Sequence, residues 1–124
     1  MRLLKIIFFL VLVSSSSLAD NNYFNEGLVF YENKEFDKAK FKFEQDIVFN
    51  PKNEKSYLYL SKIFHEQEKK ELEEKNLNTV ILLNPKNEEA TYNLAQLKLK
   101  ESDFEGSKKL IEKLIHNIYK TVFY

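Results

Sequence analysis

The chain contains an internal repeat. The pentapeptide Asn-Pro-Lys-Asn-Glu at 50–54 returns unchanged at 84–88. Repeats of about 20 to 50 residues are typical of arrays in which each unit buries its apolar face against the next, and a period of about 34 residues, as found here, fits a helix-turn-helix unit. The repeat period therefore predicts a stack of helical pairs.

A second feature keeps the same period inside the units. Gly27, Ser61 and Ala95 fall at one position of three successive units. Because glycine inside a helix costs about 1 kcal/mol relative to alanine, it is better explained by a neighbouring helix that approaches too closely for a side chain. We expect each unit to need a small residue where its two helices touch.

Apolar residues spaced three or four apart predict two helices in every unit. The first unit has such runs at 23–31 and 36–47, separated by 33–35, and the second unit has them at 57–64 and 69–83. The third unit has them at 92–97 and 104–124. Only two glycines and two prolines occur, which fits long helices with short connections. The prediction is an all-α protein of about six helices.

The duplicated pentapeptide predicts a helix end followed by a helix start. Pro51 and Pro85 lack a backbone N–H and push the preceding asparagine out of the helical region, so each Asn-Pro ends a helix. Asn53 and Asn87 can then cap the next helix, and the acidic residues that follow them favour the positive end of its dipole.

These residues resemble the tetratricopeptide repeat family, including its exported bacterial-type members, over everything after residue 19. The best-matching signature residues of the first unit are Tyr23, Gly27, Phe30, Phe36, Ala39, Phe43 and Pro51. The resemblance implies a right-handed superhelical stack of about three repeats, at 20–53, 54–87 and 88–124.

The middle unit departs from the family pattern. Glu73 stands where a small residue belongs, and Lys70 stands where an aromatic residue opens the second helix. We therefore expect the helix at 69–83 to be the least regular and its first half, from Glu68 to Lys75, to be largely solvated.

The resemblance also implies a concave groove, lined by the first helices, that holds a peptide or protein segment. Carried over position by position, the groove residues are Phe24, Asn25, Leu28, Tyr31, Leu58, Tyr59, Lys62, His65, Tyr92, Asn93, Gln96 and Leu99. The alternative is that some of these aromatic residues pack between helices, since aromatic residues at helical spacing are more often core. The family's grip on a C-terminal carboxylate is not expected, because Phe24 and Leu28 occupy positions that it needs to be polar.

Residues 1–19 are typical of a cleavable secretory signal. Arg2 and Lys5 precede an apolar run, and Ser17-Leu18-Ala19 ends in small residues before Asp20. The prediction is cleavage after Ala19 and export to the periplasm or beyond. An uncleaved anchor is the alternative, although the run is shorter than the ~20 residues that span a bilayer.

Charge and cysteine content narrow the function classes. Removal of Arg2 and Lys5 would leave two more acidic than basic residues, whereas nucleic-acid binding calls for a basic surface. The absence of cysteine excludes disulfides, a lipidated cysteine and thiolate metal sites.

The sequence does not predict an enzyme, a metal site or a cofactor. His65-Glu66 begins like a metalloprotease motif, but Lys69 stands where the second histidine is required. His116 is the only other histidine, and no set of nucleophile, base and orienting group is apparent. Two surface histidines are the expected interpretation.

The last helix carries an apolar stripe that is too wide to be covered by one preceding helix. Its C-terminal part presents Ile118, Tyr119, Val122 and Phe123. Repeat arrays generally end in a polar capping element, and none follows here. The stripe either packs further onto the preceding pair or binds another copy or another envelope protein. The main hypothesis is a non-catalytic interaction module with a groove, and the alternative is a self-associating assembly subunit.

Overall fold

The computed structural model describes residues 22–124, so the predicted signal at 1–19 lies outside it. The described part of the chain forms six helices and no strand. They are α2 (Tyr23–Glu32), α3 (Phe36–Phe49), α4 (Glu54–Glu66), α5 (Lys70–Leu83), α6 (Glu88–Lys100) and α7 (Phe104–Phe123). None of these helices is long and apolar enough to cross a membrane.

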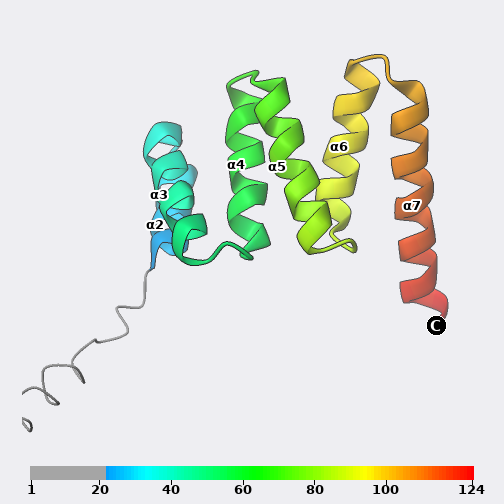
Figure 1. Cartoon of the computed structure of the whole chain (residues 1–124), viewed down its shortest axis with the longest axis horizontal. Helices are drawn as coiled ribbons and strands as arrows, with labels where there is room; N and C mark the ends of the chain where they lie inside the picture. Colours follow the sequence, from blue (N-terminus) through cyan, green and yellow to red (C-terminus); the bar gives the residue numbers. More distant parts are fainter. Residues whose placement is uncertain (1–21) are drawn as a thin grey trace, which may run out of the picture.

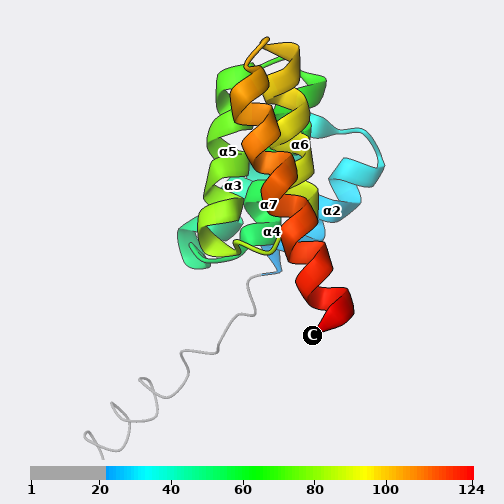
Figure 2. The same ribbon diagram turned by 90° about the vertical axis from the view of Figure 1, so that its right-hand side faces the viewer.

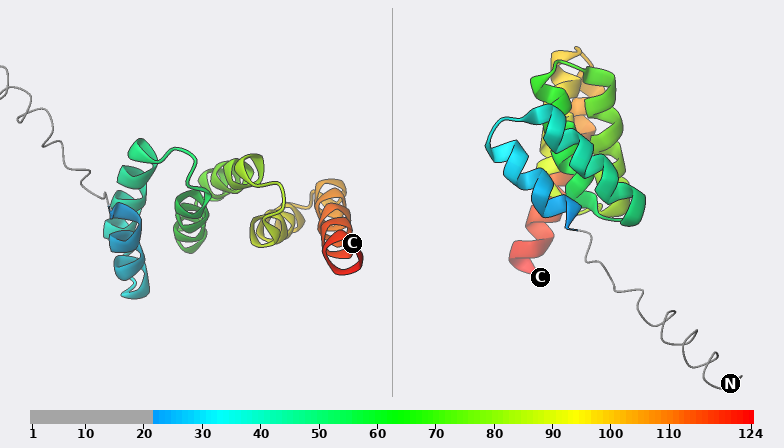
Figure 3. Two further views of the ribbon diagram at one scale, coloured as in Figure 1. Left: turned by 90° about the horizontal axis from the view of Figure 1, so that it is seen from below. Right: turned by 90° about the vertical axis from the view of Figure 1, so that its left-hand side faces the viewer.

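The helices lie side by side in sequence order along the longest axis of the molecule (Figure 1). Seen from below, successive helices alternate between two rows, and the α2–α3 pair and α7 close the two ends of the stack (Figure 3). The C-terminal part of α7 projects beyond the other helices (Figure 2). The predicted all-α stack of three helix pairs is confirmed.

The small residue predicted in every unit is buried in every unit. Gly27 is buried on α2, and a Cβ atom placed there would lie 2.6 Å from the ring of Phe43 on α3. Ser61 and Ala95 are 2% and 1% exposed. In the first unit the two helices touch at this position, as the sequence predicted.

The turn inside each unit places one residue in the left-handed region. Lys34, Glu68 and Ser102, which follow one another at the repeat period, have φ angles of 60°, 56° and 63°. In each turn the next residue donates its amide hydrogen to a carbonyl five positions earlier, for example Glu35 to Phe30 at 2.9 Å. This is the Schellman pattern of hydrogen bonds that ends a helix. None of the three positions is glycine, so residue type did not reveal the turn in advance.

The connections between units follow the predicted stop and start. α3 and α5 end at Phe49 and Leu83, directly before the Asn-Pro pairs. The side chain of Asn53 accepts a hydrogen bond from the amide of Lys55 at 3.3 Å, and that of Asn87 accepts one from the amide of Ala90 at 2.8 Å. Both predicted N-caps are confirmed.

α5 differs from its prediction. It runs without interruption from Lys70 to Leu83, as the other described helices do, so it does not stand out as the least regular helix that the sequence led us to expect. Leu77 and Val80 are fully buried and hold the helix in the stack. The residues from Glu68 to Leu72 are exposed as expected, whereas Glu73 is only 5% exposed. Burial of this carboxylate is the second correction, and its cause lies in the pocket described below.

The core consists of two clusters that meet at α4. The first is rich in aromatic residues and contains Phe43, Leu60, Ile63 and Phe64 with Ala39. The second is aliphatic and contains Leu58, Leu77, Val80, Ala90, Leu94 and Leu97. The middle repeat is therefore held from both sides. Leu58, predicted in the groove, belongs to the second cluster, and that prediction is wrong.

Candidate functional site

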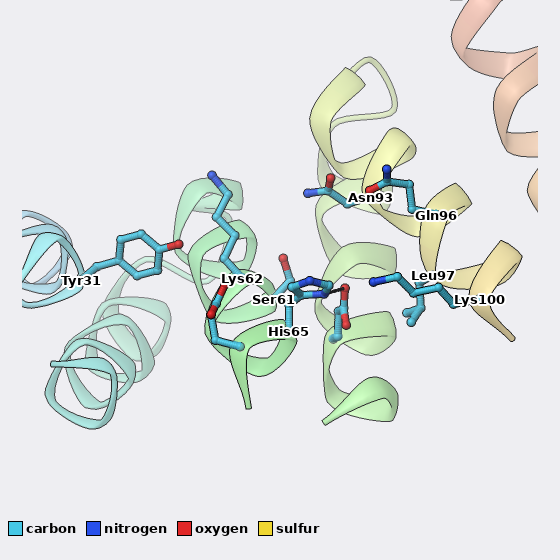
Figure 4. A pocket seen from close by; sticks show the side chains of 10 residues that line it. Tyr31, Ser61, Lys62, His65, Asn93, Gln96, Leu97 and Lys100 are labelled. Atoms are coloured by element: carbon cyan, nitrogen blue, oxygen red, sulfur yellow. Dashed lines mark hydrogen bonds and ion pairs between the residues drawn. The ribbon is translucent and has the colours of Figure 1, made fainter. Parts of the chain in front are cut away.

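The first helices of the three units surround a pocket at the centre of the stack (Figure 4). Its volume is about 140 Å³, below the roughly 300–1,000 Å³ typical of small-molecule sites. It is lined by Tyr31, Ser61, Lys62, His65, Glu66, Glu73, Asn93, Gln96, Leu97 and Lys100. A space of this size fits one or two side chains of a bound segment.

The floor of the pocket contains a histidine–carboxylate pair. His65 Nδ1 on α4 lies 2.9 Å from Glu73 Oε1 on α5 (Figure 4). The histidine side chain is half exposed, while that of Glu73 is 7% exposed. A buried carboxylate needs a polar partner, so His65 explains why the middle unit tolerates Glu73.

Lys62 connects the second and third repeats across the groove. Its Nζ atom lies 2.7 Å from Glu89 Oε1 at the start of α6. The same ammonium group lies 4.8 Å from the ring centre of Tyr59, at a distance suited to a cation–π contact. Exposure is 27% for the lysine side chain, so this pair is partly shielded from water and positions α6 relative to α4.

Tyr31 forms the side of the pocket contributed by the first repeat. Its ring packs edge-on against Tyr59 with centroids 5.0 Å apart. Burial raises the pKa of the Tyr31 hydroxyl, the Lys62 ammonium opposes this shift, and the Glu66 carboxylate reinforces it. The Tyr31 hydroxyl therefore remains a neutral donor and acceptor.

The third repeat contributes amides and one further cation. Gln96 donates from Nε2 to the hydroxyl of Tyr92 at 2.8 Å. Asn93 and Lys100 line the pocket from the same helix, α6, and Figure 4 shows both side chains there. Amides that can donate and accept suit the backbone of an extended peptide.

Apart from Leu58, which is buried in the second core cluster, the predicted groove residues fall into three groups. Tyr31, Lys62, His65, Asn93 and Gln96 line the pocket. A second group, Phe24, Leu28 and Tyr59, is partly buried and packs against the first core cluster. A third group, Asn25, Tyr92 and Leu99, is exposed on the first helices. Tyr59 in particular stacks on Phe43 at 5.2 Å, which is the packing role left open by the sequence.

Five lining residues were absent from the predicted set: Ser61, Glu66, Glu73, Leu97 and Lys100. Glu66 and Lys100 are one repeat period apart, so the period that located the other groove positions could have located both. Glu73 gave a signal as a departure from the small-residue pattern. The sequence did not show that its partner would be His65.

No group of three potential ligands among histidine, cysteine, aspartate and glutamate could hold a metal ion within residues 22–124. His116 is exposed on α7. His65 is exposed as well, so both histidines lie at the surface as expected. The sequence did not show that His65 would pair with Glu73 at 2.9 Å.

A second candidate surface lies on α7. Ile111, Ile115, Ile118, Tyr119, Val122 and Phe123 are between 36% and 67% exposed. Ile111, Leu114 and Ile115 fall one repeat period after Leu77, Val80 and Ile81 of α5. Those α5 residues pack in one cluster with Ala90 and Leu94 of α6. Ile111 and Ile115 thus occupy positions that receive the next helix elsewhere in the stack, whereas Ile118 and the apolar residues after it lie beyond the end of the equivalent helix α5.

Comparison with solved structures identifies the architecture. A structure described as MamA superposes with a TM-score of 0.79 at 15% identity, covering 82% of this chain and 60% of that one. The fold is tetratricopeptide-like. It is a right-handed superhelical stack of three helix-turn-helix repeats.

Two further matches are domains of the same kind. The first tetratricopeptide domain of Spaghetti (RPAP3), bound to the HSP90 peptide SRMEEVD, gives a TM-score of 0.70 at 16% identity over 77% of this chain and 75% of that one. The Sgt2 domain from Aspergillus fumigatus gives 0.69 at 20% identity over 80% and 66%. No protein-family model and no curated protein matches the chain. The chain spans about 60% of the first structure matched.

Proposed function

We propose that the protein is a non-catalytic interaction module of the cell envelope that holds an extended segment of another protein in its groove. The observation that carries this proposal is the pocket shared by all three repeats. It combines the donors and acceptors of Asn93, Gln96 and Tyr31 with the cations of Lys62 and Lys100.

The size and exposure of the groove residues support a peptide as the ligand. The pocket fits side chains, while Asn25 and Tyr92 extend an exposed polar surface along the neighbouring first helices. Solved neighbours of this fold include a domain bound to an HSP90 peptide and the CopN-Scc3 complex. Export rests on the sequence of residues 1–19, and the mass of the mature protein tests it.

Photocrosslinking in the native host tests the groove. A photoreactive amino acid replaces Gln96, which is exposed in the groove, and in a matched control it replaces Val48, which is 74% exposed on α3 outside the pocket. The expected result is a discrete crosslinked partner at position 96 that weakens when Asn93→Ala is added. Equal trapping at position 48, or no effect of Asn93→Ala, would contradict the proposal.

The exposed stripe on α7 favours a second candidate function, self-association. Ile111 and Ile115 lie at positions that receive the following helix in the first two repeats, and the stripe continues to Phe123 because α7 has 20 residues, whereas α3 and α5 have 14 each. A second copy of α7, equal in length and equally apolar, can cover it antiparallel in a symmetric pair. Helix α2 of a second copy would cover the stripe less well. Its exposed Asn22 and Glu26 lie one repeat period before Ser56 and Leu60, which are buried in the next repeat.

Analytical ultracentrifugation tests self-association without any other partner. Ile118→Lys is expected to abolish a concentration-dependent dimer. The same substitution at Val48, which is more exposed, is expected to leave it intact. A wild-type protein that stays monomeric at high concentration contradicts this second function.

A further inference from the structure

One position in the stack carries a charge in only one of the three repeats. Ala39, Glu73 and Ser107 are related by the repeat period and are 0%, 5% and 8% exposed. The first and third repeats fill this buried place with small side chains. The second repeat places a carboxylate there, and the carboxylate reaches the floor of the groove through His65.

The Glu73 carboxylate determines which ring nitrogen of His65 carries the proton. An ionised carboxylate only accepts hydrogen bonds, so at 2.9 Å from Glu73 Oε1 the Nδ1 atom of His65 is the donor. In the neutral ring, Nε2 is then an acceptor, and after protonation Nε2 becomes a second donor. Protonation of the half-exposed His65 therefore changes Nε2 from a hydrogen-bond acceptor to a donor toward a bound segment.

The titratable groups that line the pocket around His65 come from four helices. α2 contributes the neutral Tyr31, and α4 contributes Lys62 and Glu66. Lys62 is engaged by Glu89 at 2.7 Å. Burial is the main cause of the raised pKa of the Tyr31 hydroxyl, and the charge of Glu66 raises that pKa further. These groups belong to the side of the pocket next to the first repeat.

The side next to the third repeat has a different charge balance. α5 contributes the Glu73 carboxylate, and α6 contributes the Lys100 ammonium with the amides of Asn93 and Gln96. While His65 is neutral, the charges of Glu73 and Lys100 cancel. When His65 is protonated, this half of the pocket carries one net positive charge and presents only donors beside the amides.

We propose that this half of the pocket binds a carboxylate side chain of the segment in the groove, and that protonation of His65 strengthens the binding below neutral pH. The inference rests on the proposed function, because it assigns the ligand chemistry of the same groove. Charge-assisted hydrogen bonds from Nε2 and Lys100 to a carboxylate are among the stronger polar contacts. Histidine is the ordinary side chain whose charge changes between about pH 5 and pH 8.

Two blocked octapeptides serve as probes, one of alternating serine and glutamate and one of alternating serine and glutamine. Binding to the full mature chain is followed by NMR at about pH 7.5 and about pH 5.8, where glutamate remains ionised. The acidic peptide is expected to bind roughly tenfold more tightly at the lower pH. The glutamine peptide, which lacks the charge, is expected to show no such gain.

Two histidine variants supply the controls. His65→Gln removes the titrating group, retains an amide that can donate to Glu73, and is expected to abolish the gain at low pH. His116→Gln changes the exposed histidine of α7 and is expected to retain the gain. Unfolding by urea at both pH values checks that each variant is folded.

The outcomes separate this inference from the proposed function. An acidic peptide whose affinity does not rise at low pH, or a rise that persists in His65→Gln, overturns the inference. Failure of both peptides to bind overturns it as well. If both peptides shift the resonances of Asn93 and Gln96 equally at both pH values, the inference falls while the groove stands. The proposed function itself falls only with the crosslinking test.

Discussion

The two junctions between repeats are built in opposite ways on the same frame. Between α3 and α4, the buried Asp46 accepts hydrogen bonds from Ser56, from Asn53 at 2.7 Å and from Asn50 at 3.0 Å. Between α5 and α6, the residues at the positions of Asp46 and Ser56 are Val80 and Ala90, both fully buried. One junction is a satisfied polar network, and the other is an apolar contact.

At each junction the two buried residues are complementary to each other: Asp46 and Ser56 are both polar, and Val80 and Ala90 are both apolar. At the second junction the asparagines have no aspartate to bind, so Asn84 and Asn87 donate instead to Glu54, at 2.7 and 3.4 Å. An unpaired buried polar group destabilises a fold far more than a satisfied one stabilises it. A junction with one polar and one apolar residue should therefore be less stable than either natural pair. Every prediction below exchanges parts between equivalent positions or tests whether such positions behave alike.

The largest effect is expected for Val80→Asp, which puts the polar half of the first junction into the apolar second junction. Val80 is fully buried beside Ala90, which has no hydroxyl to offer. The two asparagines that could donate to the new carboxylate, Asn84 and Asn87, are already bound to Glu54. A buried carboxylate that lacks its partners costs about 3–5 kcal/mol, a large part of the stability of a small domain. Urea unfolding followed by circular dichroism measures the loss.

The double variant Val80→Asp with Ala90→Ser is the matched control, because it copies the whole first junction beside the existing Asn84 and Asn87. It should recover roughly 1–2 kcal/mol of the loss. Strict additivity of the two substitutions would show that the junctions are not matched pairs.

The second largest effect is expected for Asp46→Val, which removes the shared acceptor of the first junction. Ser56 is fully buried and Asn53 partly buried, and both lose a partner. The expected cost is about 2–3 kcal/mol in the same unfolding measurement. Adding Ser56→Ala completes the apolar design and should reduce the cost to below about 1 kcal/mol, since removal of both partners is nearly neutral. A double variant that is less stable than Asp46→Val argues against this view.

A third test concerns the contact between the two helices of one repeat, for comparison with the junctions between repeats. In Gly27→Ala the new methyl group would meet the buried ring of Phe43 at 2.6 Å, and Tyr59 stacks on that ring at 5.2 Å. Overpacking should cost about 1–2 kcal/mol, net of the better helix propensity of alanine. Thermal unfolding measures the shift. Adding Phe43→Leu, the residue type at position 77 of the second repeat, should remove most of the penalty from the extra methyl group.

The sequence predicted what depends on periodicity and failed where a partner had to be known. Gly27, Ser61 and Ala95 and the caps at Asn53 and Asn87 depend on local rules, so they could be located without coordinates. Glu73 could not be, because a charge on a helix is usually solvated. Only the fold brings His65 within 2.9 Å of it.

Tyr59 and Leu58 show the same limit for the groove. Period alone placed them with Lys62 on a first helix, but it could not tell which face of that helix meets α5 or the first repeat. The structure buries Leu58 at 7% exposure and packs Tyr59 against Phe43, while Lys62 remains in the groove. Most pocket residues are therefore first-helix positions outside the buried core clusters; Leu97, which belongs to the second cluster, and Glu73 on α5 are the exceptions.

The smallest effect is expected at the turns inside the repeats, which are alike in all three units. Lys34, Glu68 and Ser102 adopt positive φ angles that cost an ordinary residue about 1–2 kcal/mol. Each single change to glycine should therefore stabilise the protein by about 0.5–1 kcal/mol after the entropy of glycine in the unfolded chain is counted. The three variants are compared by midpoint in urea. Because these turns are equivalent and exposed, the three gains should agree within about 0.5 kcal/mol and add in the triple variant. A gain confined to one repeat would mean that the repeats differ in their turns as well as in their junctions.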